Sequence, residues 1–155
     1  MIKDPDTLTR LRAEWAGVTK MIERMKMLLA GTFAGGAFTA PALGGIVYNL
    51  PLLLAFDVLA QTLRALRDQN EFKCRSDSLG RLLEAGKGTV SWVDWQAIRT
   101  GVDLRNAVAH DGVLHNAKIC WNAISAVETE LLSWGVVVRS NTPLQPTSGG
   151  QVGVE

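Results

Sequence analysis

The stretch DPDTLTRLRAEWAGVTKMIERMKMLL, residues 4–29, decides the fold class. Its large apolar side chains recur at alternating steps of three and four residues, which places them along one narrow seam of a helix. The seam consists of Leu8, Leu11, Trp15, Val18, Ile22, Met25 and Leu29. Asp4 suits the cap of this helix and Pro5 its first turn. The pattern indicates a core-facing helix of a bundle, with a dedicated dimer zipper as the less favoured alternative.

Further helices are expected downstream of this stretch. They are a helix from near Asn49 to Asp68, a short helix from Ser76–Ser78 to Gly86, a helix from Ser91 to the capping Gly112, and a helix from Ala117 to Trp134. Ser91 followed by Asp94 has the spacing of a capping box. Residues 31–46 are rich in Gly and Ala and are expected to form a loosely packed loop. Because strand alternation and internal repeats are missing, the sequence predicts an all-α, up-and-down bundle of four main helices plus a short extra helix.

Length and composition suit one soluble domain. The 155 residues are 47% hydrophobic and 20% charged, as is ordinary for one globular domain. We expect the domain to span residues 1–138, and residues 139–155 to form a flexible C-terminal tail. The uncharged stretch 31–56 is long enough to cross a bilayer, but its glycines and prolines argue against a membrane span. The N-terminus lacks the apolar core of a signal peptide, so a cytoplasmic protein is expected.

Charge and metal-ligand patterns narrow the function classes. The net charge of +1 gives no bulk basic field, so an RNA partner would have to be held by local clusters. Cys74 and Cys120 lack a metal-ligand spacing and are expected to be small, mostly buried thiols. His110 and His115 are five residues apart, the wrong spacing for two ligands on one helical face. We therefore expect neither a metal nor another cofactor.

Chemistry-bearing side chains concentrate on the helix that follows Ser91. Arg99, Asp103, Asn106 and His110 follow one another at steps of four, three and four residues, so they form one polar stripe. An unperturbed histidine titrates near pH 6.5 and can move protons, whereas the fork of an arginine matches a phosphate. These are the parts that cleave a phosphodiester without a metal: one group takes the proton from the ribose 2′-hydroxyl and a cation stabilises the phosphorane.

The segment LRNAVAHDG, residues 104–112, resembles the Arg-Asn-x-x-x-His motif of the HEPN superfamily. Members of that superfamily are small helical bundles with the motif at the end of a late helix. The resemblance implies a metal-independent endoribonuclease that acts in a toxin system, in antiphage defence or in RNA processing, and that works as a homodimer. It also implies that Arg105 and His110 are the catalytic pair and that Asn106 is the polar residue following the arginine.

The spacing within this motif raises a geometric point. Five residues correspond to about 140° around an ideal helix, so Arg105 and His110 do not share a face of a regular helix. A site made by two chains across a two-fold axis would let the arginine of each chain meet the histidine of the other. Candidate auxiliary residues are Asp103, Arg99 and Asp57, the last of which lies in an apolar stretch.

Structural interpretations compete with these roles. Arg105 could bind carbonyls or an acidic side chain inside the bundle, and His110 could be a helix-terminal residue favoured by the helix dipole. Asp57 could be a solvated charge on a polar face with Gln61 and Arg64. Some HEPN members have lost activity and bind a protein such as a nucleotidyltransferase. The alternative function is therefore a non-catalytic interaction or nucleotide-binding module, and for a toxin the expected partner is an antitoxin.

Overall fold

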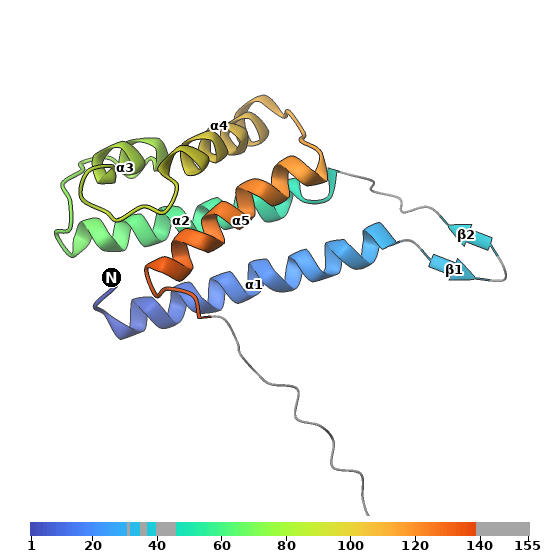
Figure 1. Ribbon diagram of the computed structural model, residues 1–155, viewed down its shortest axis with the longest axis horizontal. Helices are drawn as coiled ribbons and strands as arrows, with labels where there is room; N and C mark the ends of the chain where they lie inside the picture. The colour runs from blue at the N-terminus through green and yellow to red at the C-terminus, as the bar shows by residue number, and fades with distance from the viewer. Residues whose placement is uncertain (31, 35–36, 40–45, 139–155) are drawn as a thin grey trace, which may run out of the picture.

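A computed structural model of the chain, which describes residues 1–30, 32–34, 37–39 and 46–138, is a bundle of helices (Figure 1). Within these ranges the helices are α1 (Pro5–Ala30), α2 (Asn49–Asp68), α3 (Leu79–Gly86), α4 (Trp95–Asp111) and α5 (Ala117–Ser133). α1 and α4 run in one direction along the molecule, and α2 and α5 run in the opposite one. The predicted all-α bundle of four main helices and a short extra helix is confirmed. The predicted tail, residues 139–155, lies outside the described residues.

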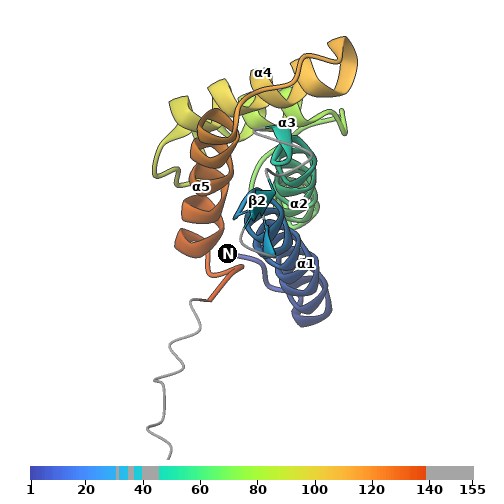
Figure 2. The same ribbon diagram turned by 90° about the vertical axis from the view of Figure 1, so that its right-hand side faces the viewer.

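α2 is the central helix and packs against each of the other four. Figure 2 shows α1 on one side of it and α3 and α4 on the other, with α5 alongside. The fully buried side chains of α2 are those that face these neighbours. They include Leu52, Phe56, Leu59 and Leu63, none of which is exposed. This burial on several sides explains why the first half of α2 is apolar almost all round.

The apolar seam of α1 lies in the bundle core. Leu11, Trp15, Val18 and Ile22 are buried there, and Leu8 and Met25 are partly buried against the same core. The side chain of Leu29, the last seam position, lies outside the described part of the chain. Because the bundle itself covers the seam, the interpretation as a core-facing helix is confirmed and the seam is not free to act as a dimer zipper.

A short hairpin follows α1, where we expected a loop without strands. β1 (Thr32–Ala34) pairs antiparallel with β2 (Ala37–Thr39), with Thr32 opposite Thr39. Figure 1 shows the hairpin beyond the end of α1. Strands of three residues are too short for a periodic signal, although a Gly-Gly pair between residues of high β-propensity is a hairpin signature. Within the Gly- and Ala-rich segment, residues 31, 35, 36 and 40–45 lie outside the described residues.

α4 starts three residues later than the sequence pattern indicates. We expected Ser91 to cap this helix, but the cap is Asp94, whose carboxylate accepts a hydrogen bond from the Ala97 amide at 2.9 Å. The physical reason is Glu130 of α5, which is 1% exposed and accepts hydrogen bonds from the amides of Val93 and Asp94. Glu130 therefore holds the residues before Asp94 outside the helix. At the other end Gly112 ends α4 in the left-handed conformation, with φ 66°, as predicted.

α4 approaches α2 closely at Gly101. A Cβ atom at this position would overlap the Cζ of Phe56, whose ring is completely buried. We expect Gly101→Ala to lower the free energy of unfolding by about 1 kcal/mol or more, because overpacking the core costs more than the gain in helix propensity. Urea unfolding measures the change.

The matched control for this substitution is Gly17→Ala in α1. Gly17 is exposed and has open space where a Cβ atom would lie. Gly17→Ala should therefore raise the free energy of unfolding by up to about 1 kcal/mol through helix propensity alone. Equal stabilisation by both substitutions would show that α4 does not need the close approach to Phe56.

α2 is also the one helix in the described part of the chain that is long and apolar enough to cross a membrane. Of the 18-residue apolar stretch within α2, 61% is buried inside the bundle. The core helix of a soluble protein has the same length and composition. The burial of α2 is therefore consistent with the soluble protein that we expected.

Candidate functional site

The Arg-Asn-x-x-x-His motif lies in the last two turns of α4, which remains helical to Asp111. Because the helix does not loosen at His110, the side chains of Arg105 and His110 leave it about 140° apart. Arg105 lies on the side of α4 that also carries the buried Ile98 and Val102, whereas His110 lies on the exposed polar stripe. A single chain therefore holds the two motif residues on different sides of one helix.

Arg105 is partly buried, and its side chain forms few polar contacts with the rest of the bundle. Its Nη1 atom donates to the Oδ1 of Asn106 at 3.2 Å, and its buried Nε atom has no hydrogen-bond partner. Within the described ranges it forms no ion pair. Buried polar atoms are nearly always hydrogen-bonded, so an unpartnered guanidinium nitrogen needs an explanation. The arrangement differs from that of an arginine that ties carbonyls or carboxylates together inside a bundle.

His110 is exposed in the last turn of α4. Its imidazole has no hydrogen-bond partner or ion-pair partner among residues 1–27 and 46–138, whose side chains are described. The ring is therefore accessible to a ligand, and both of its nitrogens are available for hydrogen bonds. Asn106 is one turn before it on the same stripe.

The candidate auxiliary residues have partners of their own. Arg99 forms ion pairs with Asp103, at 2.5 Å, and with Glu84 of α3, at 3.5 Å. Asp57 is exposed on α2, where its carboxylate accepts a hydrogen bond from Gln61 at 2.9 Å. The contacts of Asp57 are those of a solvated surface carboxylate, which is the structural alternative for this residue. The ion pair between Arg99 and Glu84 joins α3 to the middle of α4, whereas the one with Asp103 lies within α4.

The structure adds two residues that the sequence patterns missed. Asn49, at the start of α2, is 4% exposed, and its Nδ2 atom donates to the carbonyls of Ile46 and His115, each at 2.8 Å. Its Oδ1 atom accepts from the His115 amide at 2.9 Å. The His115 ring contacts the carbonyl of Leu104, next to Arg105, through Nε2 at 3.2 Å. Together, Asn49 and His115 fasten the turn after His110 to α2 and α4.

The signal for Asn49 in the sequence was a polar residue in an otherwise apolar run, but the sequence did not reveal that its partner is His115.

Cys120 of α5 lies next to His115. Its thiol lies 3.8 Å from the His115 carbonyl, and burial raises the pKa of Cys120 above the ordinary value. Cys74 and Cys120 are both free thiols, one partly and one fully buried, as expected. In the described part of the chain, no three His, Cys, Asp or Glu side chains gather closely enough to hold a metal.

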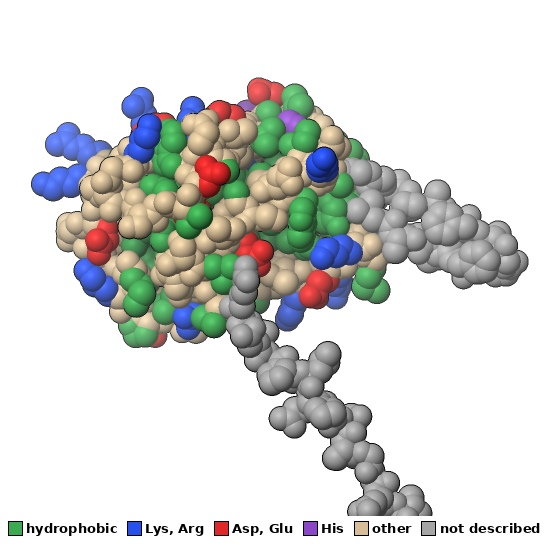
Figure 3. Space-filling view, in the orientation of Figure 1, with side chains coloured by type: hydrophobic (Ala, Val, Ile, Leu, Met, Phe, Trp, Pro, Cys, Tyr) green, Lys and Arg blue, Asp and Glu red, His purple; other side chains and the backbone are tan. Residues whose placement is uncertain are grey.

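The turn between α4 and α5 exposes large apolar side chains beside the motif. Val113 is 48% exposed and Leu114 54%, and Trp121, in the first turns of α5, is 40% exposed. Figure 3 shows hydrophobic atoms around the histidines at this end of the molecule. Adjacent exposed apolar side chains such as Val113 and Leu114 are typical of interaction surfaces.

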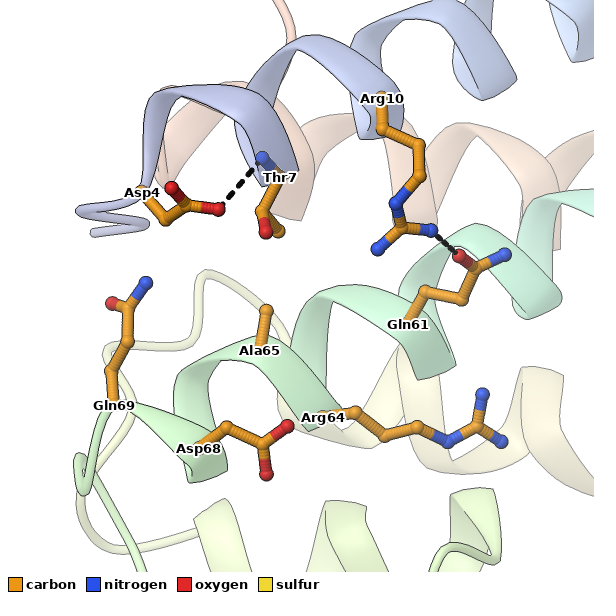
Figure 4. A pocket seen from close by; sticks show the side chains of 8 residues that line it. All are labelled: Asp4, Thr7, Arg10, Gln61, Arg64, Ala65, Asp68 and Gln69. Atoms are coloured by element: carbon orange, nitrogen blue, oxygen red, sulfur yellow. Dashed lines mark hydrogen bonds between the residues drawn. The ribbon is translucent and has the colours of Figure 1, made fainter.

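A polar cavity of about 440 Å³ lies away from the motif, between the start of α1 and the second half of α2 (Figure 4). Asp4, Arg10, Gln61 and Arg64 contribute to its walls. Hydrogen bonds from the side chain and backbone of Thr7 lower the pKa of the Asp4 carboxyl, which caps α1. Arg10 is bound to Glu14 and Gln61, so one cation of this cavity already has protein partners.

Comparison with known proteins adds no relative. The chain matches no protein-family model, no curated protein and no solved structure. The resemblance to the HEPN superfamily therefore depends on residues 104–112 and on the order of the helices.

Proposed function

We propose that the chain is a metal-independent endoribonuclease of the HEPN type that acts on RNA in the cytoplasm. The observation that carries the proposal is that the Arg105 guanidinium forms no ion pair and binds only the neighbouring Asn106 within the described residues. An arginine retained for stability would bind carbonyls or carboxylates of the bundle, because an unpartnered buried nitrogen is costly. A phosphate oxygen is the acceptor that best fits an arginine left in this state.

The reaction follows from the two side chains of the motif. His110 takes the proton of a ribose 2′-hydroxyl, the 2′-oxygen attacks the adjacent phosphorus, and the bond to the 5′-oxygen breaks. The leaving oxygen receives a proton from solvent or from a second imidazole. Arg105, oriented by Asn106, stabilises the additional negative charge of the phosphorane. The products are a 2′,3′-cyclic phosphate and a free 5′-hydroxyl.

A homodimer is part of the proposal because one chain keeps Arg105 and His110 on different sides of α4. The exposed side chains of Val113 and Leu114 directly follow the motif and provide apolar area for an interface there. Two-fold symmetry at that surface brings the same α4 end of each chain together. The arginine of one chain and the histidine of the other then form one site.

The same apolar turn also supports the alternative function, a non-catalytic module that binds a protein. An antitoxin or a nucleotidyltransferase partner would cover Val113 and Leu114 instead of a second copy. In that case the biological effect of the chain would survive replacement of Arg105 and His110, whereas the nuclease requires both residues. For the nuclease, the roles we propose are a toxin, an antiphage effector or an RNA-processing enzyme.

The test is cleavage of mixed cellular RNA by the purified chain in excess chelator. We expect cleavage to continue under these conditions, because the proposed steps use only an imidazole and a guanidinium. Mass spectrometry of the fragments should show 2′,3′-cyclic phosphate ends. Cleavage that appears only after addition of a divalent metal, or fragments with 3′-hydroxyl ends, would contradict the proposed chemistry.

A further inference from the structure

The end of the molecule opposite the motif carries uncompensated positive charge. Within residues 64–87 every acidic side chain already has a cationic partner. The pairs are Asp68 and Asp77 with Arg67, Glu71 with Lys3, and Glu84 with Arg99. Four exposed cations of the same stretch form no ion pair in the described chain. They are Lys73, Arg75, Arg81 and Lys87.

Two of these cations belong to α3 and to its C-terminal cap. Arg81 and Lys87 each lie three residues from Glu84, which puts all three side chains on neighbouring positions of one helical surface. The ion pair between Glu84 and Arg99 fixes that surface against α4. The Lys87 ammonium lies 3.9 Å from the centre of the partly exposed Trp95 ring, at the start of α4. Arg81, Lys87 and the Trp95 ring form what we call the cationic surface.

The outer stripe of α4 leads from the cationic surface to the motif. Arg99 and His110 are eleven residues apart, which returns the helix to within about 20° of the same direction. Along the axis, Trp95 and His110 are about 22 Å apart. Figure 3 shows the Lys and Arg atoms at one end of this face and the histidines toward the other. A ligand that spans both regions must therefore be an extended chain.

We infer that the cationic surface binds the RNA strand at nucleotides distant from the scissile phosphate. The inference rests on the proposed function, because the strand's other end lies at His110. Uncompensated cations bind successive phosphates, and a base would stack on the Trp95 ring once the Lys87 ammonium, now 3.9 Å from the ring centre, turns to a phosphate. Within residues 71–95, Val93 is the one large hydrophobic side chain that is exposed, whereas a helix that lies on a membrane inserts a whole apolar face.

The test uses His110→Ala as the background, so that the RNA is bound without being cut. Fluorescence anisotropy measures the affinity for a labelled single-stranded RNA of about twelve nucleotides, within the site sizes of single-strand binding proteins. Adding Arg81→Gln and Lys87→Gln should weaken binding about tenfold and should reduce the slope of log K against log salt concentration by about 1.4, or 0.7 for each lost phosphate contact.

The matched control is Lys20→Gln with Arg24→Gln on the same background. Both residues are exposed on α1, the helix that lies on the other side of α2 from α3 and α4 (Figure 2), and the two substitutions remove the same two charges. We expect less than a twofold change in affinity. Equal weakening by both double variants would show that only net charge matters and would overturn the inference. Arg81→Glu with Lys87→Glu should deepen the loss, and its circular dichroism should remain that of the native chain.

The outcomes separate this inference from the proposed nuclease. If the native chain does not cut RNA but the Arg81 and Lys87 variants still lose affinity, the nuclease is wrong and the binding surface stands. If the chain cuts RNA and these variants bind normally, the surface is wrong and the nuclease stands. Binding to phosphatidylserine vesicles, with no affinity for RNA, would assign the surface to a membrane and would also overturn the inference.

Discussion

Replacing His110 with alanine is expected to lower the kcat/KM of RNA cleavage by about 10²- to 10⁴-fold, the contribution of a positioned general base or acid. The free energy of unfolding should change by no more than about 0.5 kcal/mol, because the side chain is exposed and has no partner among the described residues. A cleavage assay in excess chelator and a urea titration measure the two quantities. Equal cleavage by the native chain and the variant would place the activity elsewhere.

The other histidine provides the matched control. The ring of His115 contacts the Leu104 carbonyl, and its backbone pairs with Asn49. We expect His115→Gln to change thermal stability more than cleavage, which is the reverse of the pattern for His110→Ala. A large loss of cleavage in stable His115→Gln would transfer the catalytic role from His110 to His115.

Mixing two inactive variants tests whether the site spans two chains. In a mixed dimer of Arg105→Ala and His110→Ala, one of the two composite sites keeps both an arginine and a histidine. Activity should therefore return, to about half that of the native dimer when every molecule is mixed. If both residues act within one chain, each chain of the mixed dimer lacks one of them and the mixture stays inactive.

Replacing Glu130 with alanine should have the largest effect on stability, lowering the free energy of unfolding by about 3 kcal/mol. The Oε1 atom accepts from the Asp94 amide at 2.8 Å and from the Val93 amide at 3.0 Å, and the carboxylate is 1% exposed. Alanine removes a charged acceptor and leaves two partly buried N–H groups without a partner. For a chain of this length, the thermal midpoint should fall by roughly 6–12 °C.

Two further variants separate these hydrogen bonds from a general effect of losing a carboxylate on α5. Glu130→Gln keeps one oxygen in place for both amides but brings an amide group against the Val93 N–H, so we expect an intermediate loss. Glu128→Ala removes an exposed carboxylate on the same helix and should change stability by no more than about 0.5 kcal/mol. If Glu130→Ala and Glu128→Ala behave alike, the contacts at the start of α4 contribute little.

Most helix positions follow from local patterns in the sequence. The seam from Leu8 to Met25 and the cap at Gly112 involve residues within a few positions of one another, and the structure has them as expected. The start of α4 shows where such reasoning fails. Ser91 has an acceptable capping pattern, but Glu130 comes from a distant part of the chain and takes the amides that a helix from Ser91 would need.

The candidate site also has features that the sequence predicts and features that only the structure reveals. The polar stripe and the separation of Arg105 from His110 follow from helix geometry alone. Two other features depend on which helices are neighbours. Arg105 has no carboxylate partner in the described residues, and Asn49 forms a hydrogen bond with the backbone of His115. No spacing rule contains that information, so these contacts could be identified only from the structure.

The central position of α2 has a consequence for synthesis of the chain. On the ribosome, α1 and α2 emerge early, but the surface of α2 that α5 covers stays uncovered until nearly all of the described chain has been made. The amides at the start of α4 also lack their hydrogen-bond acceptor until then, because Glu130 belongs to α5. A nascent chain truncated before α5 therefore lacks an anchored motif helix. For a protein proposed to cut RNA, that order of events delays a competent site until α5 has been synthesised.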